Sequence, residues 1–118
     1  MLLPVSAPFH SSLLKPAAER LASRLADVAI ASPAIPVIHN VDVAMHAAPD
    51  EIRAALARQA ASPVRWTETV RWFASHGVTH VVECGPGKVL AGMTKRIDPE
   101  MESFTLADRA SLEQALKC

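Results

Sequence analysis

The chain lacks a charge excess, a long apolar run and a set of paired cysteines, and each absence excludes a class of protein. Lys and Arg number 12, as do Asp and Glu, whereas nucleic-acid-binding proteins normally carry a basic excess. No apolar run reaches the ~18 residues of a membrane helix, and Met1–Pro4 lacks the basic start of a signal peptide. Cys84 and Cys118 fit no metal spacing and cannot form a disulfide framework. We therefore expect no nucleic acid, no membrane, no metal and a reducing cytoplasm.

Helical periodicity alternates with short apolar runs along the chain. Helices are expected over 12–29, 50–60, 62–77, 88–97 and 108–117, and strands over 35–38, 78–83 and 103–106. Ser11, Ser12, Asp50 and Asp108 are the candidate N-caps, and Gly77 the candidate helix stop. Strands separated by helices favour parallel pairing in an α/β layer. So few strands make a poor buried sheet, which predicts that the central strands of the domain lie elsewhere.

His10 stands at the entrance to the first expected helix. Pro4 and Pro8 hold the approach extended, because each proline fixes φ and pushes the preceding residue out of the helical region. The imidazole is thereby held in one place beside the start of a helix. On spacing alone, an ordinary loop histidine is the favoured interpretation of this residue.

Gln59 falls on the apolar stripe of its helix, three residues after Leu56. Its carbonyl would normally accept a hydrogen bond from the N–H four residues on, but that residue is Pro63, which has none. The carbonyl is therefore free for an outside donor. A routine helix end satisfied by water is the alternative.

The sequence resembles the malonyl-CoA:acyl-carrier-protein transacylases in the blocks LPVSAPFHSSLLKPAAERLA, IPVIHNVDV, IRAALARQAASPVRWTETVRWF and VVECGPGKVLAGMTKRI. The match is strongest over 2–97, and the tail 98–118, with an expected edge strand and last helix, matches only in character. The resemblance implies that 1–118 is a partial acyltransferase domain of the α/β class. It corresponds to the C-terminal part of the α/β-hydrolase-like large subdomain, with short parallel strands alternating with helices. The Gly-His-Ser nucleophile elbow of the family is absent.

The resemblance also assigns roles to three residues. His10 matches the catalytic histidine, the general base for a serine and then for a thiol. Gln59 matches the glutamine whose main-chain carbonyl holds Nδ1–H of that histidine, a task that a carboxylate performs in the usual triad. Phe9 matches the position where phenylalanine accompanies selectivity for malonyl, although it could merely pack the loop. The implied partners are malonyl-CoA, an acyl carrier protein and the missing N-terminal part of the enzyme, with no metal or redox cofactor.

Other features receive structural interpretations. Gly85-Pro86-Gly87-Lys88 joins a strand to a helix but fits no Walker loop, because Val89 follows the lysine, and no dinucleotide fingerprint, because Leu90 replaces a glycine. His39, His46, His76 and His80 show no metal-ligand spacing and are expected at the surface or at strand ends.

A different class of function also fits the chain. It could be a non-catalytic interaction module that docks an acyl carrier protein or a partner subunit. A separate chain could also supply the nucleophile. His10 together with the Gln59–Pro63 arrangement favours the enzyme, because a docking module needs neither feature.

Overall fold

The computed structural model describes residues 7–117, so the expectations for Pro4 and Cys118 lie outside the described residues. The chain divides into two compact units, Met1–Trp66 and Thr67–Cys118, and each is considered by itself. In the described part of the chain, no helix is long and apolar enough to cross a membrane.

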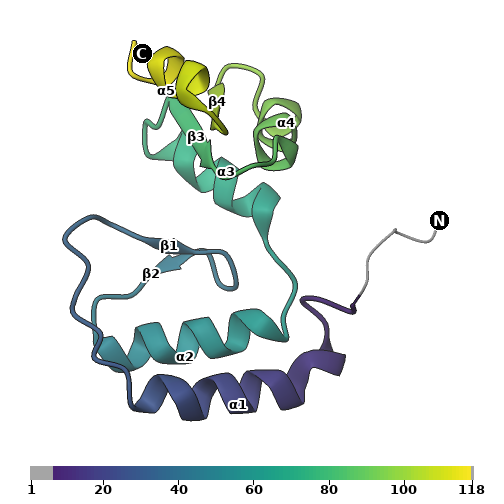
Figure 1. Cartoon of the computed structure of the whole chain (residues 1–118), viewed down its shortest axis with the longest axis vertical. Helices are drawn as coiled ribbons and strands as arrows, with labels where there is room; N and C mark the ends of the chain where they lie inside the picture. The colour runs from purple at the N-terminus through teal and green to yellow at the C-terminus, as the bar shows by residue number, and fades with distance from the viewer. Residues whose placement is uncertain (1–6, 118) are drawn as a thin grey trace. The chain divides into compact units, whose positions relative to one another are not determined.

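The first unit is built on two helices that lie side by side, α1 (Lys15–Ala26) and α2 (Pro49–Ala60), with a short 3₁₀ helix, η1 (Ser12–Leu14), before α1 (Figure 1). Ile52 and Ala55 of α2 are buried. Arg53 ties α2 to the end of α1, because Nε donates to the carbonyl of Leu25 at 2.9 Å and Nη2 donates to that of Val28 at 2.7 Å.

Three of the expected helix boundaries in this unit are wrong. α1 ends at Ala26, three residues before the expected end at residue 29. Neither Ser11 nor Ser12 caps it, since the N-cap residue is Leu14 and the Ser11 hydroxyl donates instead to the Pro8 carbonyl at 2.7 Å. Asp50 does not cap α2, because the helix already begins at Pro49, whose fixed φ and missing N–H suit a first turn.

The expected strand over 35–38 is also corrected. Strand β1 spans only Ile38–His39 and pairs with β2 (Ala44–Met45) in an antiparallel hairpin, with His39 opposite Ala44. Pro36 cannot donate to a strand ladder, and Ile35 is 76% exposed, so the apolar run before Ile38 stays outside the sheet. The prediction of parallel pairing therefore fails in this unit. The hairpin lies on the side of α2 away from α1 (Figure 1).

The second unit has the parallel α/β arrangement that the sequence predicts. Its elements are α3 (Trp66–Ser75), β3 (His80–Cys84), α4 (Val89–Ile97), β4 (Glu102–Leu106) and α5 (Arg109–Ala115). β3 and β4 pair in parallel from His80 opposite Glu102 to Cys84 opposite Leu106. Val70, Thr94 and Met101 are buried.

Local signals set the helix ends of the second unit. Gly77, at φ +77°, follows the end of α3, as expected for a left-handed helix stop. Asp108 and Ser111 form a reciprocal capping box at the start of α5. The expected start of α3 at Ser62–Pro63 is wrong, because the N–H of Arg65 is bonded to the Asn40 carbonyl at 2.9 Å and the helix begins only at Trp66.

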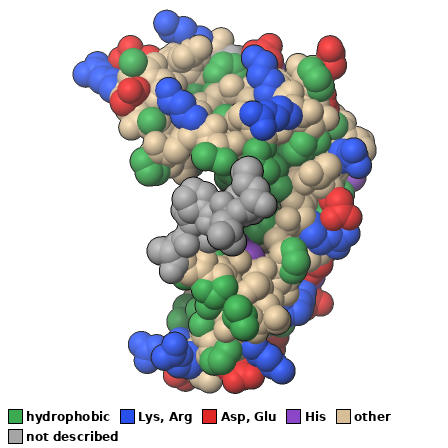
Figure 2. Space-filling view, turned by 90° about the vertical axis from the view of Figure 1, so that its right-hand side faces the viewer, with side chains coloured by type: hydrophobic (Ala, Val, Ile, Leu, Met, Phe, Trp, Pro, Cys, Tyr) green, Lys and Arg blue, Asp and Glu red, His purple; other side chains and the backbone are tan. Residues whose placement is uncertain are grey.

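Large apolar side chains lie open on both units. Figure 2 shows hydrophobic groups on the surface among charged ones. The most exposed are Phe9, Leu13 and Ile35 in the first unit and Val89 and Leu116 in the second.

Candidate functional site

His10 lies in the turn just before η1 and contacts the end of α2. Its Nδ1 is 2.9 Å from the carbonyl oxygen of Gln59, which is 49 residues away along the chain. The backbone of His10 has φ +56°, in the left-handed region that non-glycine residues seldom adopt. Such backbone strain is concentrated at active sites, where the surrounding structure maintains it.

The contact determines which nitrogen of the neutral imidazole carries the proton. A carbonyl oxygen can only accept, so Nδ1–H is the donor and Nε2 retains its lone pair. The side chain of His10 is exposed. The arrangement therefore presents Nε2 as a proton acceptor, which is the form that a general base requires.

The end of α2 explains why the Gln59 carbonyl is available. α2 ends at Ala60, and Ala61 closes the last turn by donating to the Arg58 carbonyl at 3.2 Å. Pro63 has no N–H with which to continue the helical pattern to Gln59. The main chain of Gln59 makes the contact, and its half-buried side chain is not involved.

Phe9 precedes His10 directly and is 63% exposed. Its N–H donates to the Ala7 carbonyl at 2.9 Å, which folds the segment tightly before the histidine. Phe9 and His10 therefore follow one another in a tight turn just before η1.

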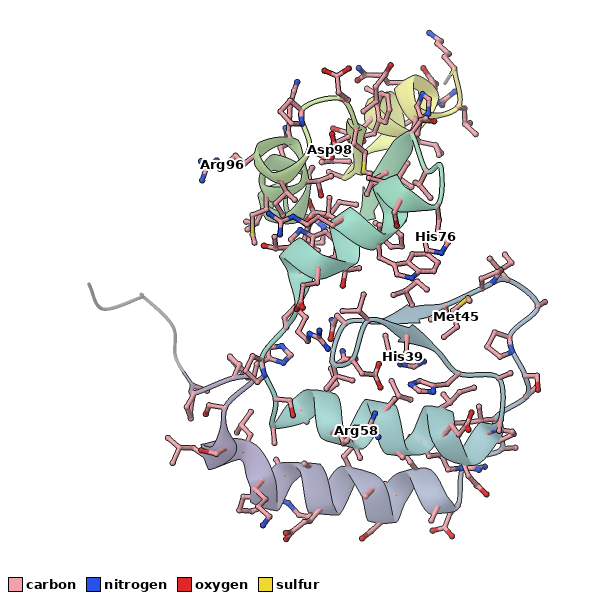
Figure 3. All side chains as sticks on the ribbon, turned by 180° about the vertical axis from the view of Figure 1, so that it is seen from behind. His39, Met45, Arg58, His76, Arg96 and Asp98 are labelled. Carbon is pink, nitrogen blue, oxygen red and sulfur yellow. The ribbon has the colours of Figure 1, made fainter. Side chains whose placement is uncertain are left out.

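A polar cluster beneath the hairpin was missed in the sequence. Asp42 Oδ2 accepts from Arg58 Nη2 at 2.6 Å and from His46 Nε2 at 2.9 Å, and the rings of His39 and His46 lie 5.1 Å apart. Figure 3 shows His39 between the hairpin and α2, and Arg58 on α2. His39 ends β1, which confirms the strand-end alternative, and it is only 6% exposed. The four-residue spacing of Asp42 and His46 across the turn was the available signal.

The members of this cluster perturb one another's protonation. Burial alone would raise the pKa of Asp42, but the hydrogen bond from His46 and the charges of His46 and Arg58 lower that pKa below its ordinary value. Burial lowers the pKa of His39, and His46 lowers it further, while Asp42 partly opposes them. Within residues 7–117, no group of three or more His, Cys, Asp or Glu could hold a metal ion.

The helix N-terminus that follows the Gly85–Lys88 turn is occupied by a carboxylate of the chain itself. Glu83, on β3, accepts through Oε2 from the N–H of Ala91 in the first turn of α4 at 2.8 Å. A carboxylate at a helix N-terminus satisfies the free N–H groups that a phosphate would otherwise bind. This contact supports a structural strand-to-helix turn at this position.

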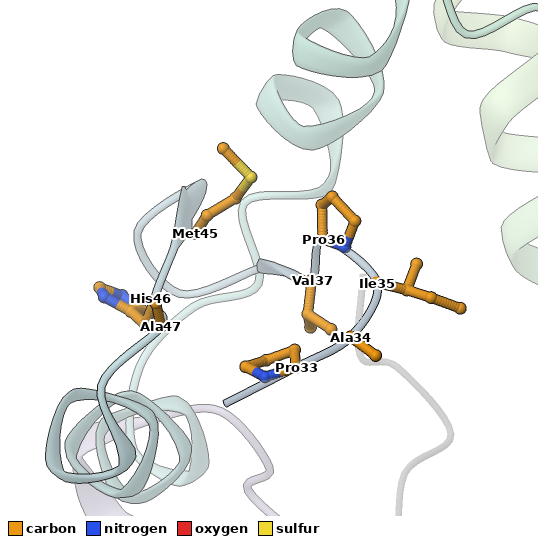
Figure 4. A pocket seen from close by; sticks show the side chains of 8 residues that line it. All are labelled: Pro33, Ala34, Ile35, Pro36, Val37, Met45, His46 and Ala47. Atoms are coloured by element: carbon orange, nitrogen blue, oxygen red, sulfur yellow. The ribbon is translucent and has the colours of Figure 1, made fainter. Parts of the chain in front are cut away.

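An apolar pocket of about 340 Å³ lies beside the hairpin, away from His10. It is lined by Pro33–Val37 on one side and by Met45–Ala47 on the other (Figure 4). Neither Phe9 nor His10 belongs to it.

The chain was compared with protein-family models, with known sequences and with solved structures. No family model matches it. It is 47% identical over 114 residues to the malonyl CoA-acyl carrier protein transacylase of Salmonella typhimurium, covering 97% of this chain and 37% of the relative. Its structure matches the acyl-carrier-protein S-malonyltransferase of Burkholderia pseudomallei 1710b with a TM-score of 0.94 at 58% identity, covering 100% of this chain and 38% of that one.

A second solved structure is a type II polyketide synthase acyl-carrier protein in complex with its malonyl-transacylase. It matches with a TM-score of 0.92 at 46% identity, and the match covers 98% of this chain and 37% of that one. The chain thus spans little more than a third of the length of its relatives, and over that span its sequence and its α/β fold are similar to those of malonyl CoA-acyl carrier protein transacylases.

Proposed function

We propose that this chain is the histidine-bearing part of an [acyl-carrier-protein] S-malonyltransferase, an enzyme that moves malonyl from coenzyme A to the phosphopantetheine thiol of an acyl carrier protein. The hydrogen bond between His10 Nδ1 and the Gln59 carbonyl, at 2.9 Å, carries this proposal. It fixes the neutral tautomer in which Nε2 accepts a proton. A docking module would have no use for that arrangement.

In the first half-reaction, His10 Nε2 takes the proton from a serine hydroxyl supplied by the remainder of the enzyme. The serine oxygen attacks the malonyl thioester, and the proton passes to the departing coenzyme A sulfur. In the second half-reaction, Nε2 takes the proton of the phosphopantetheine thiol, whose sulfur attacks the malonyl ester. The proton then returns to the serine oxygen. These steps need no metal or redox cofactor.

Phe9 is proposed to favour malonyl over methylmalonyl. The ring is exposed on the residue next to His10 in the chain, and it would occupy the space next to the substrate α-carbon once the rest of the enzyme is present. The two units are proposed to belong to one acyltransferase domain that works in the cytoplasm on malonyl-CoA. The solved carrier-protein complex of a related malonyl-transacylase supports an acyl carrier protein as the partner.

A hybrid enzyme tests the proposal. This chain would replace the matching segment of the Burkholderia pseudomallei malonyltransferase, with which it shares 58% identity. The purified hybrid, given malonyl-CoA and a carrier protein bearing phosphopantetheine, should produce malonyl-carrier, measured by mass spectrometry of the intact carrier. A folded hybrid that binds the carrier without loading it would favour the docking module instead.

A further inference from the structure

Two arginines of α2 bind other parts of the first unit, one in each half of the helix. Near its start, Arg53 donates to carbonyls at the end of α1. Near its end, Arg58 donates to Asp42 at 2.6 Å. Arg58 is the residue directly before Gln59, so the second tie acts one peptide away from the carbonyl that holds His10.

The loop between β1 and β2 holds the chain on both sides of that carbonyl. Before Gln59, the Asp42 carboxylate binds the side chain of Arg58. After Pro63, the Asn40 carbonyl accepts from the N–H of Arg65 at 2.9 Å, and the Asp42 carbonyl accepts from Arg65 Nη1 at 3.3 Å. The segment from 58 to 65 is therefore bound at each end by the same loop, through two of its residues, Asn40 and Asp42.

The loop itself has a fixed conformation. Val43 has φ +56°, a value that a β-branched residue adopts only where its surroundings impose it, and its N–H closes the loop on the His39 carbonyl at 2.8 Å. His46 donates to Asp42 Oδ2 at 2.9 Å, so the carboxylate is held in its orientation by a hydrogen bond that does not involve Arg58. The aspartate is thus a rigid anchor for the end of α2.

We infer that Asp42 is a positioning residue that, through Arg58, keeps the Gln59 carbonyl aimed at His10 Nδ1. The Asp42 carboxylate binds His46 and Arg58 and not His10, and its effect on catalysis rests on the proposed function. Its effect on the His10 tautomer does not. The side chains of Arg58 and Asp42 are 51% and 27% exposed, so their ion pair contributes little to stability and its main consequence is geometric.

The experiment uses the same hybrid with ¹⁵N-labelled histidine. The ring nitrogen shifts of His10, assigned by their loss in His10→Gln, report the protonated nitrogen. In the unsubstituted hybrid they should show Nδ1–H. Asp42→Asn and Arg58→Gln should each lower the population of this tautomer. They should also lower kcat by about 10- to 100-fold, the usual effect of a small misplacement of a catalytic group, while KM for malonyl-CoA stays nearly constant. Arg58→Lys, which keeps a donor, should recover much of both.

Arg53→Gln is the matched control on the same helix. It removes the tie to α1, so it should lower the melting temperature more than Arg58→Gln does and leave the His10 tautomer unchanged. Unaltered His10 shifts in Asp42→Asn and Arg58→Gln would overturn the inference, as would an equal tautomer change in Arg53→Gln. A tautomer change in a hybrid that never loads the carrier would support the positioning and reject the proposed function.

Discussion

The carbonyl oxygen of Gln59 lies 2.9 Å from Nδ1 of His10, the place that a carboxylate occupies in a catalytic triad. A main-chain acceptor keeps its position when the side chain changes. It is lost only when the backbone moves or another donor competes for it. Substitutions at this site should therefore act according to their effect on the backbone.

Gln59→Ala and Pro63→Ala should consequently behave differently in the hybrid. Gln59→Ala retains the carbonyl and should leave kcat/KM within a few-fold of the original value. Pro63→Ala restores an N–H four residues after Gln59, which competes with His10 for that carbonyl, and should lower kcat on the order of 10-fold. Steady-state kinetics measures both. A larger loss in Gln59→Ala than in Pro63→Ala would show that the side chain makes the functional contact.

Phe9 gives a prediction about selectivity. Phe9→Ser opens space beside the substrate α-carbon, so the preference for malonyl-CoA over methylmalonyl-CoA should fall by about 10- to 200-fold, the range for one methyl group in a pocket. Competition between the two thioesters, measured by mass spectrometry of the loaded carrier, gives the ratio. Leu13→Ser removes another exposed apolar side chain nearby and should leave the ratio unchanged. If Phe9→Ser also leaves it unchanged, the ring only packs the loop.

At the scale of secondary-structure elements, the β1–β2 hairpin and α2 share a polar cluster that should make stability depend on pH. Its buried histidine, His39, has a pKa in the folded protein that lies below the ordinary value of 6.5. Between this lowered pKa and 6.5, the unfolded state therefore binds more protons than the folded state. Stability is then lost as the pH falls below 6.5. Asp42 has a lowered pKa too, so its contribution is present above 3.8 and is lost only as the pH falls further.

His39→Gln in the hybrid should separate these two ranges of pH. The variant lacks the titrating ring, so its melting temperature should fall less than that of the unsubstituted hybrid between pH 7 and pH 5. Below pH 3.8 both proteins should still lose the contribution of Asp42. His80→Gln, at an exposed position, serves as the control. Parallel melting curves for the unsubstituted hybrid and His39→Gln between pH 7 and pH 5 would contradict the assignment of the upper range to His39.

The sequence predicted the elements whose ends carry a local signal. Asp108 and Gly77 set their helix ends within a few residues, and the apolar run near Val81 predicted β3. The hairpin was not predictable, because two residues per strand are too few to show an alternating pattern. His39 and Asp42 also looked unremarkable, since only the hairpin brings them to Arg58. The bond between His10 and Gln59 was expected only through the family resemblance, and spacing alone left it open.

At the scale of the whole molecule, the chain spans 37% of the length of the relative from Salmonella typhimurium. A nucleophile elbow places its serine on a sharp turn from a strand to a helix. The turns from β2 to α2, from β3 to α4 and from β4 to α5 contain no serine.

The isolated chain should therefore not accept a malonyl group. After incubation with radiolabelled malonyl-CoA, the denatured protein should carry no label above background. The unsubstituted hybrid, treated in the same way, should retain a stoichiometric label that hydroxylamine releases. A stoichiometric, hydroxylamine-labile adduct on the isolated chain would mean that it supplies its own nucleophile.

The most direct test of the central claim is the rate of serine acylation in the hybrid with His10→Ala, measured in a single turnover by rapid quench. Loss of a general base should lower this rate by roughly 10²- to 10⁴-fold. His76→Ala, which removes an exposed histidine from the same chain, should acylate at the rate of the unsubstituted hybrid. Acylation of His10→Ala at close to that rate would contradict the assignment of His10 as the general base.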